Sequence, residues 1–312
     1  SGYFTDIVTY GLVRTDIGSI KTDLKLSSNK EKGYFSYSGA VKTEEFELGN
    51  MLANDQLGKV TFNLKVEGSH YEKQYPSIIM KGLIASIDYS DYNYENITLD
   101  GEYKQGGFNG KVALDDPNGS IYLNGDVNVS SRIPTFNFQA IINKLRPHDL
   151  NLTSKHPDTE FSLKLRANFT GGSVDEMIGE INVDSLEFMS PEKQYFMNNM
   201  NIRASKQNNE NQLRLTSEFL TASVEGKFQY HTLPASILNI MRKYVPSLIL
   251  PPKKPIETHN NFQFDIHIYN TDILSTIFDI PLTVYTHSTL KGYFNDPLQR
   301  LRVEGYFPRL QY

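Results

Sequence analysis

Two short histidine and aspartate pairs are the residues that come closest to a catalytic or metal-binding arrangement. His148 precedes Asp149, and His156 lies two residues before Asp158, in a stretch that also contains prolines. An imidazole beside a carboxylate can transfer protons or hold zinc. Each pair supplies only two groups on an irregular segment, so we predict a solvated loop without a metal or an acid–base role.

Two further clusters have the composition of a ligand-binding site. Asp115 and Asp116 could give carboxylates to calcium, but residues 117–119 add too few ordered oxygens, so we predict a turn. The glycine-rich residues 106–110 are not followed by a helical pattern. A phosphate-binding loop needs a helix at that point, so we predict a hairpin corner there as well.

The rest of the sequence lacks the usual signatures of enzymes. It contains no Gly-x-Ser-x-Gly, no phosphate loop ending in Lys-Ser or Lys-Thr, and no His-Glu-x-x-His. The absence of cysteine from all 312 residues excludes disulfides, thiolate metal sites and cysteine nucleophiles. The formal net charge of -5 argues against nucleic-acid binding, which relies on clustered cations. We therefore predict a protein that is not an enzyme and uses no cofactor.

The elements that must position any site are predicted to be β-strands. Tyr and Phe, which favour strands, number 19 and 18. Residues 121–129 alternate between apolar and polar, residues 108–114 do the same, and the turn residues between them complete a hairpin. Similar alternation is found in residues 20–26, 60–66, 161–169, 181–188, 213–219, 224–230 and 262–268.

Three segments are predicted to be short helices. Residues 233–248 carry an apolar stripe at helical spacing, residues 138–146 form a shorter amphipathic segment that ends before a proline, and residues 270–278 form a third. These segments follow groups of strands and do not alternate with single strands, so a doubly wound α/β fold is not expected.

The order of strands and helices repeats weakly along the chain. Four strands and a helix in residues 82–145 recur over residues 163–248, and a third copy begins at Phe262. The predicted fold class is all-β with a few short amphipathic helices, an elongated curled sheet or open β-groove built from repeated β-meanders. The expected units are residues 1–150 ending in a short helix, residues 151–255 with helix 233–248 and a proline-rich linker, and residues 256–312 as a truncated third unit.

The apolar faces of these strands exceed what three short helices can cover. A sandwich would bury them as ordinary core, whereas a large uncovered apolar face normally marks a ligand or membrane contact. We predict a groove for phospholipid acyl chains. Its candidate lining residues are Ile121, Leu123, Val127, Val129, Ile181, Val183, Leu213, Leu215, Phe219 and Phe228.

The basic residues of the segment 226–256 would suit binding to anionic lipid headgroups. No acidic residue lies between Glu225 and Glu257. The candidates to face headgroups or a membrane are Arg242, Lys243, Lys253 and Lys254. A solvated helix face is the alternative interpretation.

Two series of motifs in residues 40–150 are similar to those of a known family. Residues 46–52, then Leu57-Gly58 and the strand after them, match its succession of strand, short helix, Leu-Gly and strand. Residues 92–101, 108–110, 114–118 and 123–125 match its string Tyr-x-Tyr-x-Asn-Ile-x-Leu-x-Gly, then Phe-x-Gly, Asp-x-Asn and Gly. On these motifs, residues 40–150 resemble the TamB family of the AsmA-like superfamily.

This resemblance implies a periplasmic protein of Gram-negative bacteria, anchored in the inner membrane by a segment outside this sequence. It implies a long curled sheet with an apolar groove that moves phospholipid between the two membranes. It also implies support of outer-membrane protein assembly, with an outer-membrane barrel of the TamA or BamA type as partner. No catalytic residue is implied. The sequence begins at Ser1, and we expect it to be part of a longer protein.

Two other functions fit the same composition. A scaffold could bind partner strands along its sheet edge with no lipid in the groove. A carbohydrate-binding β-sandwich could use the many tyrosines as platforms for sugar rings, although it would lack tryptophan.

Overall fold

The chain folds almost entirely into β-strands, which confirms the predicted all-β class. The computed structural model describes residues 2–3, 6–29, 33–71, 76–154, 157–233, 235–236, 239, 258–270, 283–284, 287–298, 300–308 and 310–311. The chain divides into two compact units, described separately below. The N-terminal unit comprises residues 1–166 and 186–196, and the C-terminal unit comprises residues 167–185 and 197–312. These limits differ from the expected boundaries at 150 and 255.

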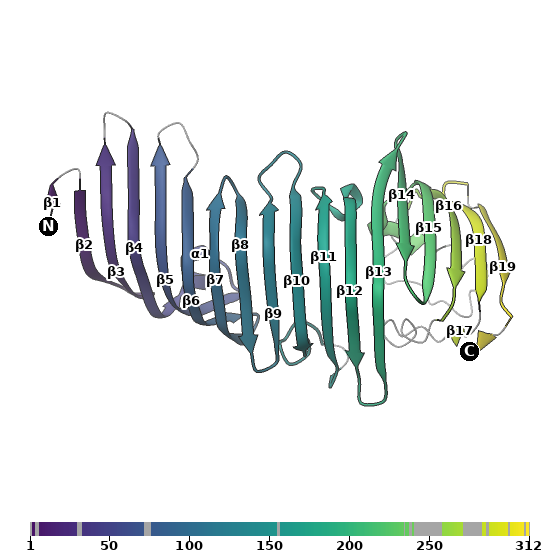
Figure 1. Cartoon of the computed structure of the whole chain (residues 1–312), viewed down its shortest axis with the longest axis horizontal. Coiled ribbons are helices and arrows are strands. Elements are labelled where there is room, and N and C mark those ends of the chain that lie inside the picture. The colour runs from purple at the N-terminus through teal and green to yellow at the C-terminus, as the bar shows by residue number, and fades with distance from the viewer. Residues whose placement is uncertain are drawn as a thin grey trace. The chain divides into compact units, whose positions relative to one another are not determined.

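The N-terminal unit is an antiparallel meander in which each strand from β1 to β10 pairs with the next one in sequence (Figure 1). The five-residue helix α1 (Leu48–Leu52) stands between β4 and β5, where the short helix was expected. The strands are β1 (Gly2–Tyr3), β2 (Asp6–Thr15), β3 (Gly18–Asn29), β4 (Tyr34–Glu47), β5 (Leu57–Tyr71), β6 (Ser77–Tyr89), β7 (Tyr92–Lys104), β8 (Gly107–Asp116), β9 (Gly119–Asn128) and β10 (Thr135–Leu145).

The C-terminal unit is also an antiparallel meander. Its pairing runs from β13 (Gln194–Gln207) through β14 (Glu210–Thr216), β15 (Leu220–Lys227), β16 (Asn261–Ile268) and β18 (Ser288–Asn295) to β19 (Arg300–Tyr306). Residues of β11 (Glu160–Thr170), β12 (Ile178–Met189) and β13 fall in both units. Smaller elements are the 3-10 helices η1 (Val174–Glu176) and η2 (Tyr230–Thr232), and the paired strands β17 (Thr283–Val284) and β20 (Leu310–Gln311).

The helix predicted over residues 138–146 is wrong, because these residues lie in strand β10. Nine residues of β10 pair with β9, from Thr135 opposite Asn128 to Asn143 opposite Ser120. Phe138, Ala140 and Ile142 all face the same side, so the segment also has a two-residue period that the helical spacing concealed. Tertiary pairing with β9 decides between the two patterns. Most of helix 233–248, all of the linker and residues 271–278 lie outside the described residues.

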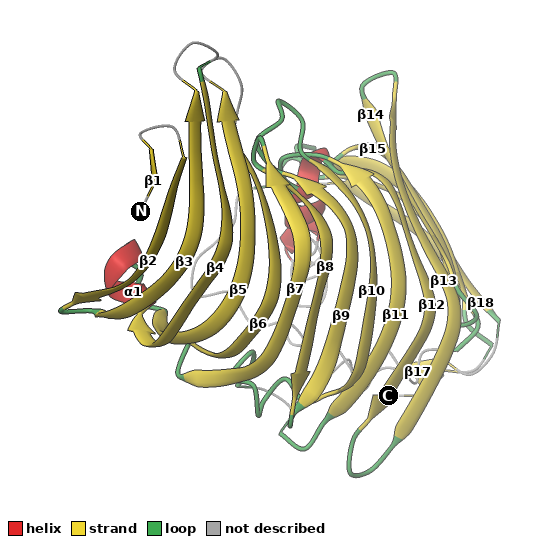
Figure 2. Cartoon of the chain, turned by 60° about the vertical axis from the view of Figure 1, so that its left-hand side comes forward, coloured by secondary structure: helices red, strands yellow, loops and turns green. Residues whose placement is uncertain are grey.

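The strands of the N-terminal unit are bent along their length (Figure 2), and several of them contain a glycine with positive φ. Gly39, Gly82 and Gly125 have φ of 149°, 157° and 158°, in a region that other residues rarely adopt. A Cβ atom at Gly39 would stand 1.9 Å from the carbonyl oxygen of Asp23 on β3. Glycine kinks at neighbouring positions of a sheet introduce curvature, so these residues let the strands curl.

Candidate functional site

Backbone pairing collects the apolar side chains of the N-terminal unit on one side of its sheet, here called the apolar face. Residues directly opposite each other in an antiparallel pair point to the same side. One row across β3 to β10 consists of Ile20, Thr43, Phe62, Ile84, Ile97, Leu114, Ile121 and Ile142. The next row consists of Thr22, Val41, Leu64, Gly82, Leu99, Val112, Leu123 and Ala140.

The opposite side, here called the polar face, carries mostly charged and amide residues. One of its rows reads Asp23, Ala40, Lys65, Lys81, Asp100, Lys111, Asn124 and Gln139. Lys81 Nζ lies 2.7 Å from Asp100 Oδ2 on the neighbouring strand. A slip by one residue would exchange the two faces, so this segregation fixes the strand register.

The C-terminal unit repeats the arrangement. One row of its apolar face reads Ile202, Leu215, Ala222, Ile266 and Leu290, and another reads Ala204, Leu213, Val224, Phe264 and Gly292. Its polar face carries Arg203, Arg214, Ser223, Asp265 and Lys291 in one row. Lys291 Nζ lies 2.9 Å from Asp265 Oδ2. Both units thus present one apolar and one polar side.

An aromatic cluster closes one end of the apolar face in the C-terminal unit. Phe228, Phe262 and Phe294 are buried, and Leu213 packs against them. The rings of Phe262 and Phe294 are stacked with their centroids 4.9 Å apart. This part of the face is ordinary core, and the row that contains Leu213, Val224 and Phe264 packs directly against it.

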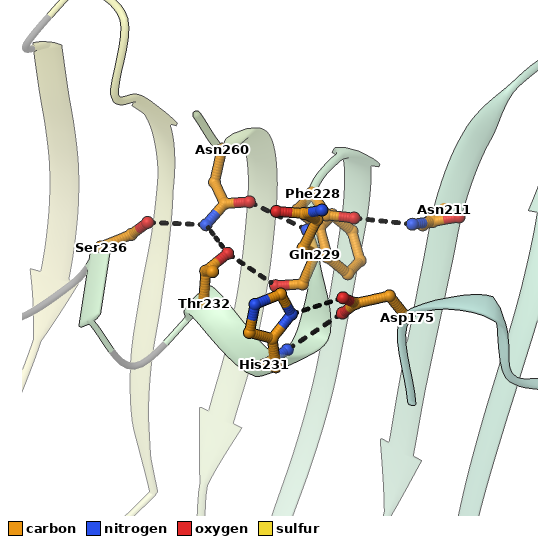
Figure 3. A network of polar contacts seen from close by, with 8 residues as sticks. All are labelled: Asp175, Asn211, Phe228, Gln229, His231, Thr232, Ser236 and Asn260. Atoms are coloured by element: carbon orange, nitrogen blue, oxygen red, sulfur yellow. Dashed lines mark hydrogen bonds and ion pairs between the residues drawn. The ribbon is translucent and has the colours of Figure 1, made fainter. Parts of the chain in front are cut away.

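A buried polar network, which the sequence did not predict, holds the chain beside this cluster (Figure 3). Asn260 is 1% exposed and its Nδ2 donates to Thr232 Oγ1 at 2.9 Å and to Ser236 Oγ at 2.6 Å. The Gln229 N–H donates to Asn260 Oδ1 at 2.9 Å. These partners are 24 to 31 residues away in sequence, so no local motif could have indicated the network.

A second contact in Figure 3 joins the two 3-10 helices of the C-terminal unit. The backbone N–H of His231 donates to Asp175 Oδ1 at 3.1 Å, and the His231 ring contacts Asp175 Oδ2. The nearby Tyr230 has its pKa raised by burial and by the charge of Asp175. The pair anchors η2 on η1.

The predicted groove residues of the N-terminal unit are mostly on the apolar face. Ile121, Leu123 and Val127 lie on it in β9. Val129 lies just beyond this strand, because β9 ends at Asn128, whose Oδ1 accepts the N–H groups of Ser130 and Ser131. Its side chain is 61% exposed in the following loop. The place of Val129 in the groove stays a prediction.

The predicted groove residues of the C-terminal unit lie in several different places. Leu213 and Leu215 lie on the apolar face, whereas Phe219 lies in the turn between β14 and β15 and Phe228 joins the aromatic cluster. Ile181 is half-buried and Val183 buried, both in β12. Arg242, Lys243, Lys253 and Lys254 lie outside the described residues.

Asp115 and Asp116 lie at the end of β8, where the chain turns into β9. Asp116 is buried and accepts hydrogen bonds from the Tyr92 hydroxyl at 2.6 Å and from the backbone N–H groups of Asn118 and Glu95. Burial and the hydrogen bond to Asp116 raise the pKa of Tyr92 to about 12. These hydrogen bonds hold Asp116 at the hairpin turn, as turn chemistry predicts.

The other candidate sites are parts of loops. His148 Nδ1 lies 3.5 Å from Asp149 Oδ1, with both side chains largely solvated, while His156 lies outside the described residues. Gln105 and Gly106 join β7 to β8, which confirms the hairpin corner. Within the described ranges, no three His, Asp or Glu side chains are grouped closely enough to hold a metal ion.

No helix in the described part of the chain has the length and apolarity needed to cross a membrane. Comparison of the chain with protein families, with curated proteins and with solved structures finds no match.

Proposed function

We propose that this protein binds phospholipid acyl chains on the apolar faces of its sheets and acts as a non-enzymatic conduit for lipid. The proposal rests on the separation of the two faces, because the rows of the apolar face named above contain no charged residue across β3 to β10. The resemblance of residues 40–150 to the TamB family supports the same function independently. It adds a periplasmic location and a role in outer-membrane assembly to the proposal.

Area burial supplies the physical basis for binding. Each methylene group that leaves water contributes about 0.8 kcal/mol. Seven strand spacings of about 4.8 Å separate β3 from β10, so a row is about 34 Å long along its contour. An extended acyl chain reaches about 15 Å, half of the hydrocarbon thickness of a bilayer. The face of the N-terminal unit is therefore long enough for more than one chain in succession.

A photocrosslinking experiment tests lipid binding. A photoreactive residue would replace Leu123 on the apolar face of β9 or, as its matched control, Asn124 on the polar face of the same strand. Leu215 and Arg214 form the equivalent pair on β14. After expression in a Gram-negative bacterium and purification without detergent, lipid adducts are detected by mass spectrometry.

We expect adducts at Leu123 and Leu215 and few at Asn124 and Arg214. Equal labelling of both faces, or protein that is lipid-free and unlabelled at all four positions, would contradict the proposal. If lipid is absent but an outer-membrane protein is captured, the scaffold function is the better account.

A further inference from the structure

The apolar face of the N-terminal unit is covered at one end of its strands. After β10 the chain crosses to the hairpin of β6 and β7 in residues 146–151, here called the strap. The hydroxyl of Tyr94, on the apolar face, donates to the carbonyl oxygen of Leu150 at 2.8 Å, and Asn151 Nδ2 donates to the carbonyl oxygen of Asp91 at 3.1 Å. Leu150 is fully buried. Other buried apolar residues at this end are Phe46, Val60, Leu114 and Leu145.

The opposite end of the same strands carries exposed apolar side chains. It is formed by residues 104–106 between β7 and β8 and residues 129–134 between β9 and β10, here called the tips (Figure 1). The Val129 N–H donates to the carbonyl oxygen of Gly106 at 3.3 Å, which holds the two tips together. Val129 is 61% exposed and Ile133 is 60% exposed. The two ends of the strands therefore differ sharply in burial.

The tips also carry positive charge. Lys104 and Arg132 are both exposed. The sequence has no acidic residue from 103 to 114 or from 127 to 148. Beside the tips, Tyr103 lies on the apolar face and is 44% exposed. Exposed aliphatic side chains together with tyrosine and cations are typical of protein surfaces that lie in the interface of a bilayer.

We propose that the tips dock on a bilayer that contains anionic lipids. Val129 and Ile133 enter the interfacial region, while Lys104 and Arg132 contact headgroup phosphates. This inference rests on the proposed lipid function, and it assigns the exchange of acyl chains with the membrane to the exposed end of the apolar face. Asn128 Oδ1 accepts two N–H groups of the loop after β9, so the tip is already ordered before it docks.

Flotation with lipid vesicles tests the docking. We expect the protein, purified without detergent, to float with vesicles of equimolar phosphatidylcholine and phosphatidylglycerol, and much less with phosphatidylcholine alone. High salt should weaken the binding, because it screens the attraction between cations and phosphates.

A pair of double variants tests the site. Val129→Ser with Ile133→Ser should lower the association constant for the anionic vesicles at least about tenfold, a change of about 1.4 kcal/mol. The matched control is Met51→Ser with Leu52→Ser on α1, at the covered end, where these side chains are 53% and 56% exposed. This control should bind like the unmodified protein.

A fluorescent label reports which end meets the lipid, and the absence of native cysteine makes the labelling specific. An environment-sensitive dye is attached to Ile133→Cys or, as the control, to Leu52→Cys. Anionic vesicles should shift the emission to shorter wavelength for the dye at position 133 and leave the dye at position 52 unchanged.

Three results would overturn the docking. These are no binding to anionic vesicles, equal binding by the two double variants, and an equal shift of the dye at both positions. Circular dichroism checks that each variant is folded, which we expect because the replaced side chains are exposed.

Photocrosslinking at Leu123, described above, separates this inference from the proposed function. Lipid adducts at Leu123 without vesicle binding would overturn the docking alone. Vesicle binding through the tips without lipid at Leu123 would support the docking and contradict the conduit.

Discussion

At the scale of single residues, the positions that matter most for the curled sheets are those where a side chain would not fit. Gly39 pairs with Leu24 on β3 and Val66 on β5, and its positive φ lets neighbouring backbone approach closely. Asp116, in contrast, acts through its side chain. Its carboxylate accepts hydrogen bonds from Tyr92, Glu95 and Asn118 at the end of a hairpin. Both residues shape the surface on which the proposed function depends.

Replacement of Gly39 by alanine is expected to lower the free energy of unfolding by about 2–3 kcal/mol. The new methyl group would need a φ that alanine rarely adopts and would collide with the carbonyl group of Asp23. The control is Gly11→Ala on β2, where no atom lies within 4 Å of the added Cβ. Urea unfolding should show a change within about 0.5 kcal/mol for this control. Equal losses in both variants would rule out strain at Gly39.

The stability of the protein should depend on Tyr92 at alkaline pH. The pKa of this phenol is about 12 in the folded chain, against an unfolded value near 10. The protonated phenol therefore stabilises the fold below about pH 10, and this contribution is lost as the pH rises towards about 12. Urea unfolding at several alkaline pH values should show a shallower decline for Tyr92→Phe than for the unmodified protein. Parallel declines would mean that Tyr92 is not responsible.

At the scale of elements, the sequence predicted strands well where alternation was long and one face was apolar. Residues 121–128, 213–216 and 262–268 all lie in strands, as expected. Residues 138–145 were misassigned because their apolar spacing fits a helix and a strand equally, and only the pairing with β9 decides. The strand predicted to reach Val129 ends one residue earlier, because Asn128 accepts hydrogen bonds from the two residues after Val129 and makes a turn.

The network around Asn260 could not be predicted, because its members meet only after β16 has paired with β15. Asn260→Ala should lower the free energy of unfolding by about 3 kcal/mol, since it leaves the buried hydroxyl groups of Thr232 and Ser236 and the N–H group of Gln229 short of a partner. Gln263→Ala, at an exposed position of the same strand, is the control and should change stability little. Thermal unfolding of both variants measures the difference, and similar melting temperatures would contradict the role assigned to Asn260.

At the scale of the whole molecule, both units repeat one rule, an apolar side and a polar side separated by strand register. The candidate residues predicted from the sequence include only some of the residues on the apolar faces. They included Ile121 and Leu215 but missed Phe62, Ile84 and Leu114, which the same alternation rule would have found once applied to every strand. The faces emerge only when the registers of all strands are known.

Lipid bound to the protein should show little preference for its headgroup. The rows of the apolar face contact acyl chains, and those given above contain no charged side chain that could select one headgroup over another. Mass spectrometry of lipid extracted from the purified protein should therefore match the composition of the host membranes. Enrichment of one headgroup class by more than about tenfold would indicate a selective site that the apolar rows do not provide.

The pairing of each strand with its neighbour in sequence has a consequence for how the chain reaches its native state. From β1 to β10, no pairing has to wait for a distant part of the sequence. Loop-closure entropy is then small at every step, and local contacts favour rapid folding. A chain that emerges gradually, N-terminus first, can add one hairpin arm at a time, so that each finished strand templates the next one to appear.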